Sequence, residues 1–360
     1  MGVEIDFLAV GEESKSGDAI ALRYGDLLGS RSEQMVIVVD GGYSEDGEKV
    51  VDFVRTYYKT DKVDLVLSTH PDRDHIGGLP TVISNLDVKQ LWMHLPWRHS
   101  ASLSAGKSLG FGYLRLAERL EKSLDESVGL EKLAGQLGIP ILEPFTGVTS
   151  RDGNFVILGP TQDFYTELLA EIKPPTAATT IKELLRKAAE AAGDVVSYVA
   201  ESFDIETLTD DGETQPQNET SAVSYLRWNG QAFLLTGDVG LRGLSHIANV
   251  LDANGVTPGS LTFFQVPHHG SQRNVGPAIL HRLLGSKDSS ASRGHAFISA
   301  AAKGKPKHPS KKVTNAMHRR GYRPYVTQGG NKWHFDGAPS RDTYSPADPE
   351  PFHYQVEESE

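Results

Sequence analysis

The sequence predicts an α/β fold, because short apolar runs typical of buried strands alternate with segments of helical spacing. Residues 34–40 form a β-branched run, residues 47–58 have helical spacing, and residues 63–70 form a second buried run. At 360 residues, 38% of them hydrophobic, the chain is long enough to bury a large core. We therefore expect one substantial α/β domain.

The individual elements follow from these two patterns, helical spacing for the helices and short apolar runs for the strands. In the first half we expect helices at 47–58, 76–86 and 103–137, and strands at 3–10, 18–25, 34–40, 63–70, 88–95, 141–145 and 154–160. In the second half we expect strands at 222–228, 231–238, 261–269, 295–300 and 324–328.

Two segments depart from this alternation. Residues 162–217 have a different composition, with a clear helix at 181–193 and a polar loop at 210–220, and we interpret them as a helical insertion. Residues 336–360 are rich in proline and acidic residues, so we expect a poorly ordered tail. The predicted domain therefore spans residues 1–335.

The composition narrows the class of protein. The chain has no cysteine, which excludes disulfides, thiolate metal ligands and a cysteine nucleophile. No apolar run approaches the length of a membrane span, and the N-terminus shows no secretory signal. We expect a cytoplasmic protein without membrane insertion, and the oligomeric state stays open.

The net charge of −11 is unevenly distributed. Residues 289–335 contain no Asp or Glu but ten basic residues, whereas the rest of the chain has 26 basic and 47 acidic residues. Such a segment is either a site for a polyanion or a solvated basic face. The basic residues are Arg293, Lys303, Lys305, Lys307, Lys311, Lys312, Arg319, Arg320, Arg323 and Lys332.

The central motif carries four potential metal ligands within six residues, after a buried strand and before a glycine pair. They are His70, Asp72, Asp74 and His75. A regular helix or strand cannot point all four inward, whereas a tight loop can. A divalent cation would offset the repulsion between the two carboxylates. The motif therefore predicts a metal site.

This motif resembles the metal-binding loop of the metallo-β-lactamase superfamily, although Asp72 stands where a histidine is commoner. The variant is similar to the hydrolase domain of ComEC-type DNA-uptake proteins and to phosphorylcholine esterases. Further segments resemble the same family in the same order, except in the insertion and the tail. They are Gly17-Asp18-Ala19-Ile20, Asp40-Gly41-Gly42, Asn218 to Ser221, Gly237-Asp238, His268-His269-Gly270-Ser271 and His308-Pro309-Ser310.

The resemblance implies a four-layer αββα sandwich with a two-metal site at one edge. His70 and Asp72 would hold one metal, Asp74 and His75 the other, and Asp238 would bridge them. Asp40 would orient the loop from behind the ligands. The last ligand would be His269 or His268, and we favour His269, which leaves His268 behind the ligands or facing substrate.

One family ligand is missing. The family usually has another histidine between the loop and the bridging aspartate, but the segment 154–160 contains none. His94 and His99 are the available histidines, and either is an extra ligand, a substrate contact or a structural residue. With three histidines and three carboxylates as ligands, Zn²⁺, Mn²⁺ and Fe²⁺ all suit the site.

The resemblance also implies a mechanism. Two metals would activate a bridging water as hydroxide and neutralise a phosphoryl group during attack. Asp74 or Asp238 would orient the nucleophile, and His268 or His308 would donate a proton to the leaving oxygen or hydrogen-bond a phosphate. His308 could instead simply cap its helix.

Further residues are expected to bind substrate. Asn218 and Ser271 belong to the motifs above, and Lys307, Lys311 and Lys312 surround His308 in the sequence. In the helix after His308 we expect Val313, Ala316 and Met317 to be buried, which would leave Lys311, Lys312 and Arg319 facing outward.

Three functions remain. The basic segment favours a phosphodiesterase or nuclease that acts on DNA or another nucleic acid. The alternative is a hydrolase of a small substrate such as a phosphorylcholine ester, a cyclic nucleotide or a lactone. The third, a degenerate binding module, has no need of Asp72, Asp74, His75 and Asp238. Of these, only a nucleic-acid enzyme should lose affinity for its substrate steeply as the salt concentration rises.

Overall fold

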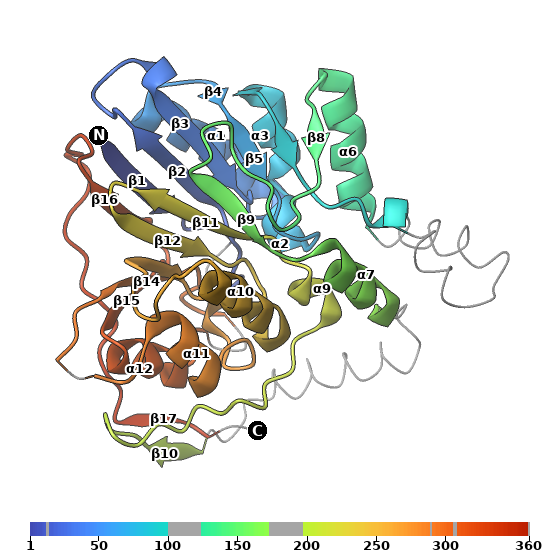
Figure 1. The fold of residues 1–360 in the computed structure, drawn as a ribbon. Coiled ribbons are helices and arrows are strands. Elements are labelled where there is room, and N and C mark those ends of the chain that lie inside the picture. Colours follow the sequence, from blue (N-terminus) through green and yellow to red (C-terminus); the bar gives the residue numbers. More distant parts are fainter. Residues whose placement is uncertain (12–13, 100–123, 173–196, 289, 305–307, 359–360) are drawn as a thin grey trace, which may run out of the picture.

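The computed structural model describes residues 1–11, 14–99, 124–172, 197–288, 290–304 and 308–358 (Figure 1). Two β-sheets pack face to face, and helices cover the outer face of each sheet. The result is a four-layer αββα sandwich, so the predicted fold class is confirmed.

The first sheet has seven strands, in the order β16-β1-β2-β3-β5-β7-β8. Helices α1 (Gly47–Phe53), α3 (Leu79–Asn85) and α6 (Asp125–Leu137) cover its outer face. The strands are β1 (Gly2–Phe7), β2 (Ile20–Gly25), β3 (Gln34–Val39), β5 (Leu65–Leu67), β7 (Leu91–Trp92), β8 (Ile141–Leu142) and β16 (Lys332–Asp336). Two short strands, β4 (Lys62–Val63) and β6 (Asp87–Val88), pair separately.

The second sheet has six strands, in the order β15-β14-β13-β12-β11-β9, and β12 to β15 run parallel. Its outer face is covered by α10 (Leu241–Ala253), α11 (Pro277–Leu284) and α12 (Lys311–Arg319). The strands are β9 (Phe155–Gly159), β11 (Val223–Trp228), β12 (Gln231–Leu235), β13 (Phe263–Gln265), β14 (Gly294–Ile298) and β15 (Tyr322–Val326).

Strand β3 buries side chains on both faces of the first sheet. Its side chains alternate between the two faces, as the pleat requires. Val36 and Val38 pack under the helices of the first sheet, whereas Ile37 and Val39 pack against the second sheet. A continuous β-branched run therefore marks a strand with both faces covered.

Part of the predicted insertion and of the long helix before it can be compared with the structure. Residues 125–137 of the predicted helix 103–137 form α6, and residues 162–171 form α7 (Gln162–Glu171). The predicted helix 181–193 lies outside the described residues. Among the helices that the described ranges contain, none combines the length and apolar character needed to cross a bilayer.

The prediction of a poorly ordered tail was wrong. Strand β17 (Gln355–Glu357) pairs with β10 (Tyr198–Ala200), and Val356 is fully buried. Upstream, the Arg341 guanidinium lies 2.6 Å from both Glu4 and Asp6, two buried carboxylates of β1. The tail is ordered because these carboxylates need a positive partner and β10 needs a neighbouring strand. The edge strand β16 was not identified from the sequence.

Candidate metal centre

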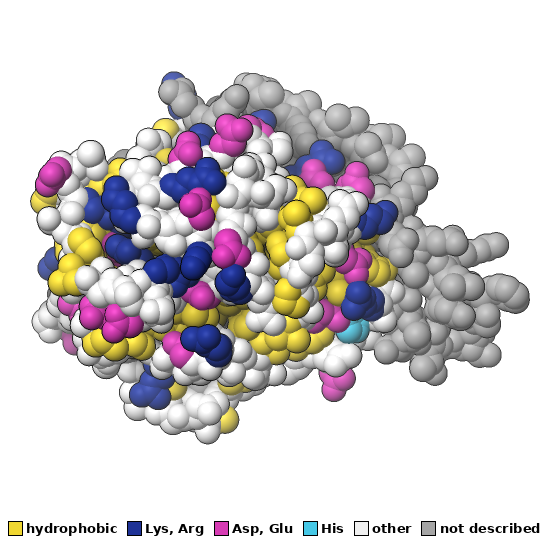
Figure 2. Space-filling model, turned by 90° about the horizontal axis from the view of Figure 1, so that it is seen from above, with side chains coloured by type: hydrophobic (Ala, Val, Ile, Leu, Met, Phe, Trp, Pro, Cys, Tyr) yellow, Lys and Arg dark blue, Asp and Glu magenta, His cyan; other side chains and the backbone are white. Residues whose placement is uncertain are grey.

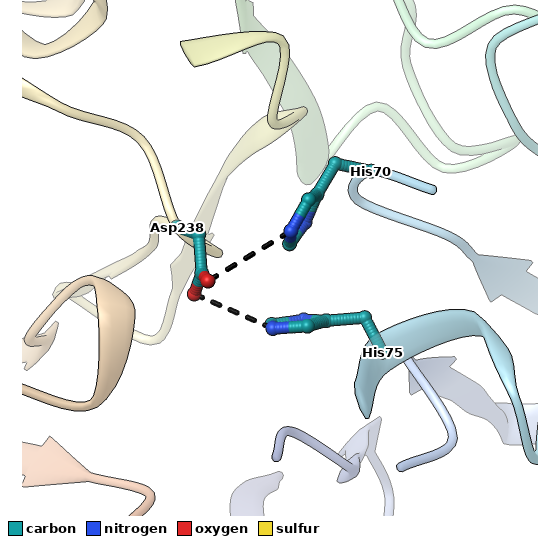
Figure 3. A group of neighbouring side chains, drawn as sticks. All are labelled: His70, His75 and Asp238. Atoms are coloured by element: carbon teal, nitrogen blue, oxygen red, sulfur yellow. Dashed lines mark ion pairs between the residues drawn. The ribbon is translucent and has the colours of Figure 1, made fainter. Parts of the chain in front are cut away.

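The candidate ligands gather at one edge of the sandwich, where strands of both sheets end. His70 follows β5 of the first sheet, while Asp238 and His268 follow β12 and β13 of the second. Figure 3 shows the side chains of His70, His75 and Asp238 converging from these two sides. The fold thus brings together segments that lie more than 150 residues apart in the sequence.

Asp238 lies between two histidines of the loop. His70 Nε2 is 3.8 Å from Asp238 Oδ2, and His75 Nε2 is 3.4 Å from Asp238 Oδ1 (Figure 3). The two carboxylate oxygens therefore face different imidazoles. These three residues can together hold a metal ion.

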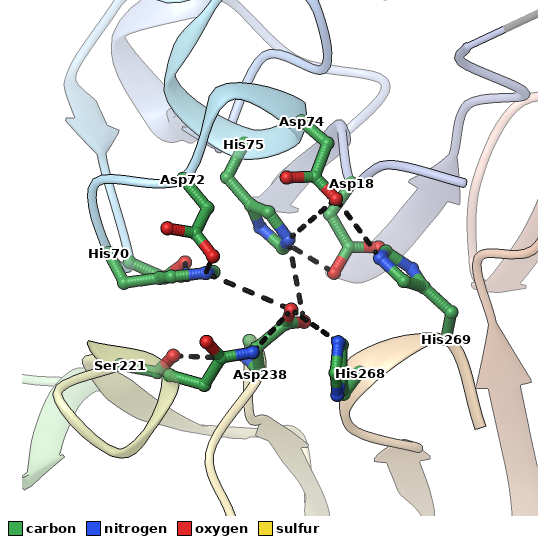
Figure 4. A network of polar contacts seen from close by, with 12 residues as sticks. Asp18, His70, Asp72, Asp74, His75, Ser221, Asp238, His268 and His269 are labelled. Atoms are coloured by element: carbon green, nitrogen blue, oxygen red, sulfur yellow. Dashed lines mark hydrogen bonds and ion pairs between the residues drawn. The ribbon is translucent and has the colours of Figure 1, made fainter. Parts of the chain in front are cut away.

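The other loop residues extend the cluster on both sides of Asp238 (Figure 4). Asp72 Oδ2 is 3.5 Å from His70 Nε2. On the far side, Asp74 Oδ2 is 3.3 Å from His269 Nε2 and 3.9 Å from His75 Nε2. Asp74, His75 and His269 form a second group that can hold a metal ion.

The two neighbouring histidines 268 and 269 face different parts of the cluster. His269 is 5% exposed and contacts Asp74, whereas His268 Nε2 lies 3.6 Å from Asp238 Oδ2, the same oxygen that faces His70. Both residues have positive φ, 50° for His268 and 56° for His269. This left-handed turn lets consecutive side chains both reach the cluster, which an extended strand would prevent.

Four imidazoles use Nδ1 for a hydrogen bond to an acceptor behind the cluster. His75 Nδ1 is 2.8 Å from Asp40 Oδ2, and His269 Nδ1 is 2.9 Å from the Ser299 carbonyl oxygen. His268 Nδ1 is 2.9 Å from Asn274 Oδ1. The amide nitrogen of Asn274 donates to two backbone carbonyls, and this turns its oxygen toward His268.

His70 follows the same pattern. Its Nδ1 is 3.1 Å from Thr69 Oγ1, whose own proton is donated to Asp40. Histidines that bind metals commonly donate their second N–H in this way, which leaves Nε2 with a lone pair. All four Nε2 atoms are thus prepared as ligand atoms.

Asp40 organises the loop from behind, as the resemblance implies. It accepts hydrogen bonds from the Thr69 backbone N–H at 2.8 Å and the Thr69 hydroxyl at 2.7 Å, besides the contact with His75. The backbone after Asp40 lies close to the glycine pair that follows the metal loop. A Cβ on Gly78 would lie 2.1 Å from the Gly41 carbonyl oxygen, so only glycine fits there. Both glycine-containing motifs are therefore needed to hold one loop against the other.

The side chains fit a divalent cation. Within the described part of the chain, the buried atoms His70 Nε2, His75 Nε2 and Asp238 Oδ1 have no hydrogen-bond partner. Such buried polar atoms are costly unless something compensates them. Imidazole nitrogen and carboxylate oxygen are the ligand atoms that Zn²⁺, Mn²⁺ and Fe²⁺ accept.

The electrostatics of the cluster point the same way. Although burial opposes it, the charge on His75 and the hydrogen bond from His269 lower the pKa of Asp74 to about 2. Burial likewise opposes protonation of His269, but the charge of Asp238 and the hydrogen bond to Asp74 raise the pKa of His269 to about 9. The carboxylates therefore demand positive charge at this place, which bound cations can supply.

Sequence reasoning missed three residues around the cluster. Asp18 is buried, accepts a hydrogen bond from Gln265 Nε2 at 2.9 Å and lies 3.9 Å from His75 Nδ1. Gln217 donates to Asp72. Asp18 stands in the motif 17–20 and could have been suspected there, but Gln217 and Gln265 carry no signal in the sequence.

The other predicted residues of the site lie at different distances from the cluster. Asn218 Nδ2 is 3.4 Å from Asp238 Oδ2. Ser271 is buried, and its hydroxyl accepts a hydrogen bond from the Arg273 backbone N–H. The His308 ring lies 6.2 Å from the ring of His268 and 6.4 Å from that of His269.

The expectation that Lys312 and Arg319 face outward was wrong. Lys312 is 3% exposed and Arg319 is fully buried, where it contacts Glu201 at 2.9 Å. The segment 201–206 and the tail cover this face of α12, which removes Lys312 from the surface that a substrate can reach. Lys311 Nζ lies 5.4 Å from the centre of the Tyr198 ring. Lys307 lies outside the described residues.

The structure does not bring His94 or His99 into any of the three groups of described residues that could hold a metal ion. His94 is buried, and its ring stacks on Tyr165 at 4.4 Å. Among the described residues, neither of its ring nitrogens has a hydrogen-bond partner. His99 Nε2 is 2.9 Å from Glu143 Oε1, a contact that fixes it away from the cluster.

His94→Phe is expected to keep the metal content and to make the protein less sensitive to acid. Burial and the charge on His99 lower the pKa of His94 to about 3, whereas an unfolded histidine has a pKa of about 6.5. The unfolded state therefore binds the proton first, and stability falls as the pH drops below about 6.5. Between pH 7 and pH 5, the free energy of unfolding measured with urea should fall by about 2 kcal/mol less in the variant than in the unchanged protein. Loss of one metal equivalent would instead make His94 a ligand.

The comparisons with known proteins agree with this geometry. Residues 31–284 match the model of the Metallo-beta-lactamase superfamily. No curated protein matches the chain. Among solved structures, a candidate metallo-beta-lactamase from Thermotoga maritima is 12% identical with a TM-score of 0.31, over 71% of this chain and 93% of that one.

Two further solved structures are similar to the chain. The hydrolase AbOPH of the beta-lactamase superfamily is 13% identical with a TM-score of 0.27, over 64% of this chain and 59% of that one. The metallo-beta-lactamase SMB-1 bound to 2-mercaptoethanesulfonate is 12% identical with a TM-score of 0.27, over 68% and 76%. The family is established by the match to the family model, which covers most of the chain.

Proposed function

We propose that this chain, which belongs to the metallo-beta-lactamase superfamily, is a two-metal hydrolase of phosphodiesters, with a nucleic acid as its first candidate substrate. The observation that carries the proposal is the position of Asp238, whose two carboxylate oxygens face His70 and His75 separately. Two-metal sites recur in enzymes that cleave phosphate esters. The resemblance to ComEC-type hydrolase domains supports the same chemistry.

The residues divide into two sets around Asp238. We assign His70, Asp72 and His268 to the first cation and Asp74, His75 and His269 to the second. His268 Nε2 and His70 Nε2 face the same oxygen of Asp238, at 3.6 and 3.8 Å. On this assignment His268 supplies the ligand that the missing mid-chain histidine supplies elsewhere in the family.

This assignment changes the roles that remain for proton transfer. When bound, two divalent cations would activate a water and neutralise charge on a phosphoryl group. Asp74 would orient the attacking water through its second carboxylate oxygen, because both oxygens of Asp238 already face histidines of the two sets. His268, whose Nδ1 proton is held by Asn274, is a ligand on this account and not an acid.

His308 is left to contact the substrate. Burial and the charges on His269 and His268 lower the pKa of His308 to about 3, which keeps the ring neutral at pH 7. A neutral imidazole is a poor acid but retains one N–H donor. His308 Nδ1 is buried without a partner among the described residues, which suits a lone pair, so we assign the N–H to Nε2 and its hydrogen bond to a phosphoryl oxygen.

The basic segment gives nucleic-acid binding less support than its composition suggests. Arg319 and Arg320 are buried in ion pairs with Glu201 and Glu206. On the face seen from above in Figure 2, Lys and Arg side chains alternate with Asp and Glu and form no large area of one sign. The burial of Arg319 and Arg320 favours a second candidate, a small phosphodiester such as a cyclic nucleotide or a phosphorylcholine ester.

Turnover of a panel of substrates tests the proposal. We expect the protein reconstituted with Mn²⁺ or Zn²⁺ to hydrolyse bis(p-nitrophenyl) phosphate, and Asp74→Ala to lose this activity. Single-stranded DNA, double-stranded DNA and RNA are assayed in parallel. Equal activity of the Asp74→Ala variant, or cleavage of a lactone but of no phosphodiester, would contradict the proposal.

The response to salt separates the two candidate substrates. A nucleic-acid substrate releases counterions when bound, so KM should rise steeply between 50 and 200 mM salt, by about 10-fold for every two phosphate contacts. A small singly charged ester should show little change. Measurement of KM for both kinds of substrate at several salt concentrations decides between them.

A further inference from the structure

A second polar pocket lies at the opposite end of the second sheet from the candidate metal centre. It has a volume of about 270 Å³ and is lined by residues that include Gln231, Thr262, Arg293, His295, Arg323 and His334. Strands β12 to β15 run parallel, and all of these residues except His334 of β16 stand within two residues of a strand start, whereas Asp238 and His268 follow the strand ends. At about 3.3 Å per residue, the two sites are roughly 20 Å apart.

The pocket has a positive lining in a chain of net charge −11. Arg293 and Arg323 are among its lining residues, and no Asp or Glu is among the described ones. The carboxylate of Asp336, outside the lining, accepts a hydrogen bond from Gln231 at 2.7 Å. The pocket is therefore suited to an anion.

The two arginines are held in different ways. Arg293 Nη1 donates to the carbonyl oxygens of Ser286 and Arg320, at 2.9 and 2.8 Å, which fixes its guanidinium while leaving other N–H groups for a ligand. Arg323 is exposed, and its Cα is paired with that of His295 across β14 and β15. Guanidinium groups match the oxygens of a phosphate with paired N–H donors.

The two histidines supply a neutral donor. His295 Nδ1 and His334 Nδ1 lie 3.0 Å apart, so one of them donates and the other accepts. His334 Nε2 is buried and has no hydrogen-bond partner in the described part of the chain. Burial without a partner costs less for a nitrogen lone pair than for an N–H. His334 therefore donates from Nδ1, and His295 carries its proton on Nε2.

We propose that this pocket binds the phosphate group of a small phosphorylated ligand, at a site separate from the candidate metal centre. Arg293 and Arg323 provide the charge, and His295 Nε2 provides a further N–H. The volume exceeds that of a bare phosphate and leaves room for the group that carries it. Burial and the charge on Arg323 lower the pKa of His295, which agrees with a locally positive potential.

Calorimetric titration with inorganic phosphate tests the proposal. Since phosphate can also bind at the metal centre, the titration uses metal-free Asp238→Asn protein. We expect one phosphate per chain, and Arg323→Gln or His295→Gln in this background should weaken binding about tenfold, as loss of one charge-assisted hydrogen bond implies. Arg151→Gln, at an exposed arginine of a turn in residues 150–153, is the matched control and should change nothing.

Two results would overturn the proposal. One is no phosphate binding by the metal-free Asp238→Asn protein. The other is binding that Arg323→Gln and His295→Gln leave unchanged, since these side chains then do not contact the anion. Arg323→Gln in the otherwise unchanged protein should keep its hydrolytic rate, because Arg323 lies far from the metal centre.

Discussion

Asp238→Asn is expected to lower the hydrolytic rate by more than about 100-fold and to reduce the amount of bound metal. Replacement of residues behind metal ligands already costs about 10- to 100-fold, so removal of a carboxylate shared by two cations should cost more. Asp238 faces His70, His75 and His268, and asparagine cannot supply two anionic oxygens to these neighbours. Rates are measured with bis(p-nitrophenyl) phosphate, and metal content is measured by mass spectrometry.

Asp252→Asn is the matched control for this variant. Asp252 stands on the exposed face of α10 and pairs with Arg282 at 2.5 Å, so its replacement should change neither the rate nor the metal content. Circular dichroism establishes that both variants fold. A folded Asp238→Asn protein with unchanged activity and metal content would remove Asp238 from the site.

Arg319→Ala is expected to destabilise the protein by about 3–5 kcal/mol, the cost of leaving a buried charge without its partner. Arg319 is fully buried, lies 2.9 Å from Glu201 and donates to the carbonyl oxygens of Ser202, Phe203 and Ile205. Its loss leaves the buried Glu201 carboxylate without a counter-charge and these carbonyl oxygens without their donor. The free energy of unfolding is measured by urea denaturation.

Arg242→Ala is the comparison for this prediction. Arg242 pairs with Glu171 at 2.7 Å, but both side chains are about half exposed, so the pair should contribute less than about 1 kcal/mol. If Arg319→Ala costs no more than Arg242→Ala, the segment 201–206 does not depend on Arg319 for its place on α12.

The residues of the candidate metal centre were largely predictable because they stand in short motifs at strand ends. The spacing from His70 to His75 indicates a metal loop without any structure, and Asp40 and Asp238 follow recognisable strands. The supporting contacts were not predictable. Asp18 and Gln265 are 247 positions apart, and nothing local in either segment indicates that one side chain hydrogen-bonds the other.

Helix α12 shows a different limit of sequence reasoning. Its apolar stripe of Val313, Ala316 and Met317 is buried as predicted. Periodicity says which face packs on the sheet, but it does not say whether the opposite face meets solvent. Here the segment 201–206 and strand β17 cover that face, so Lys312 and Arg319 became buried polar residues.

The most direct test of the two-metal account is anomalous diffraction from crystals of the protein grown with Mn²⁺. The account predicts two anomalous peaks per chain, one beside His70 and His268 and one beside Asp74 and His269, with Asp238 between them. A single peak, or peaks that contact none of these residues, would contradict it.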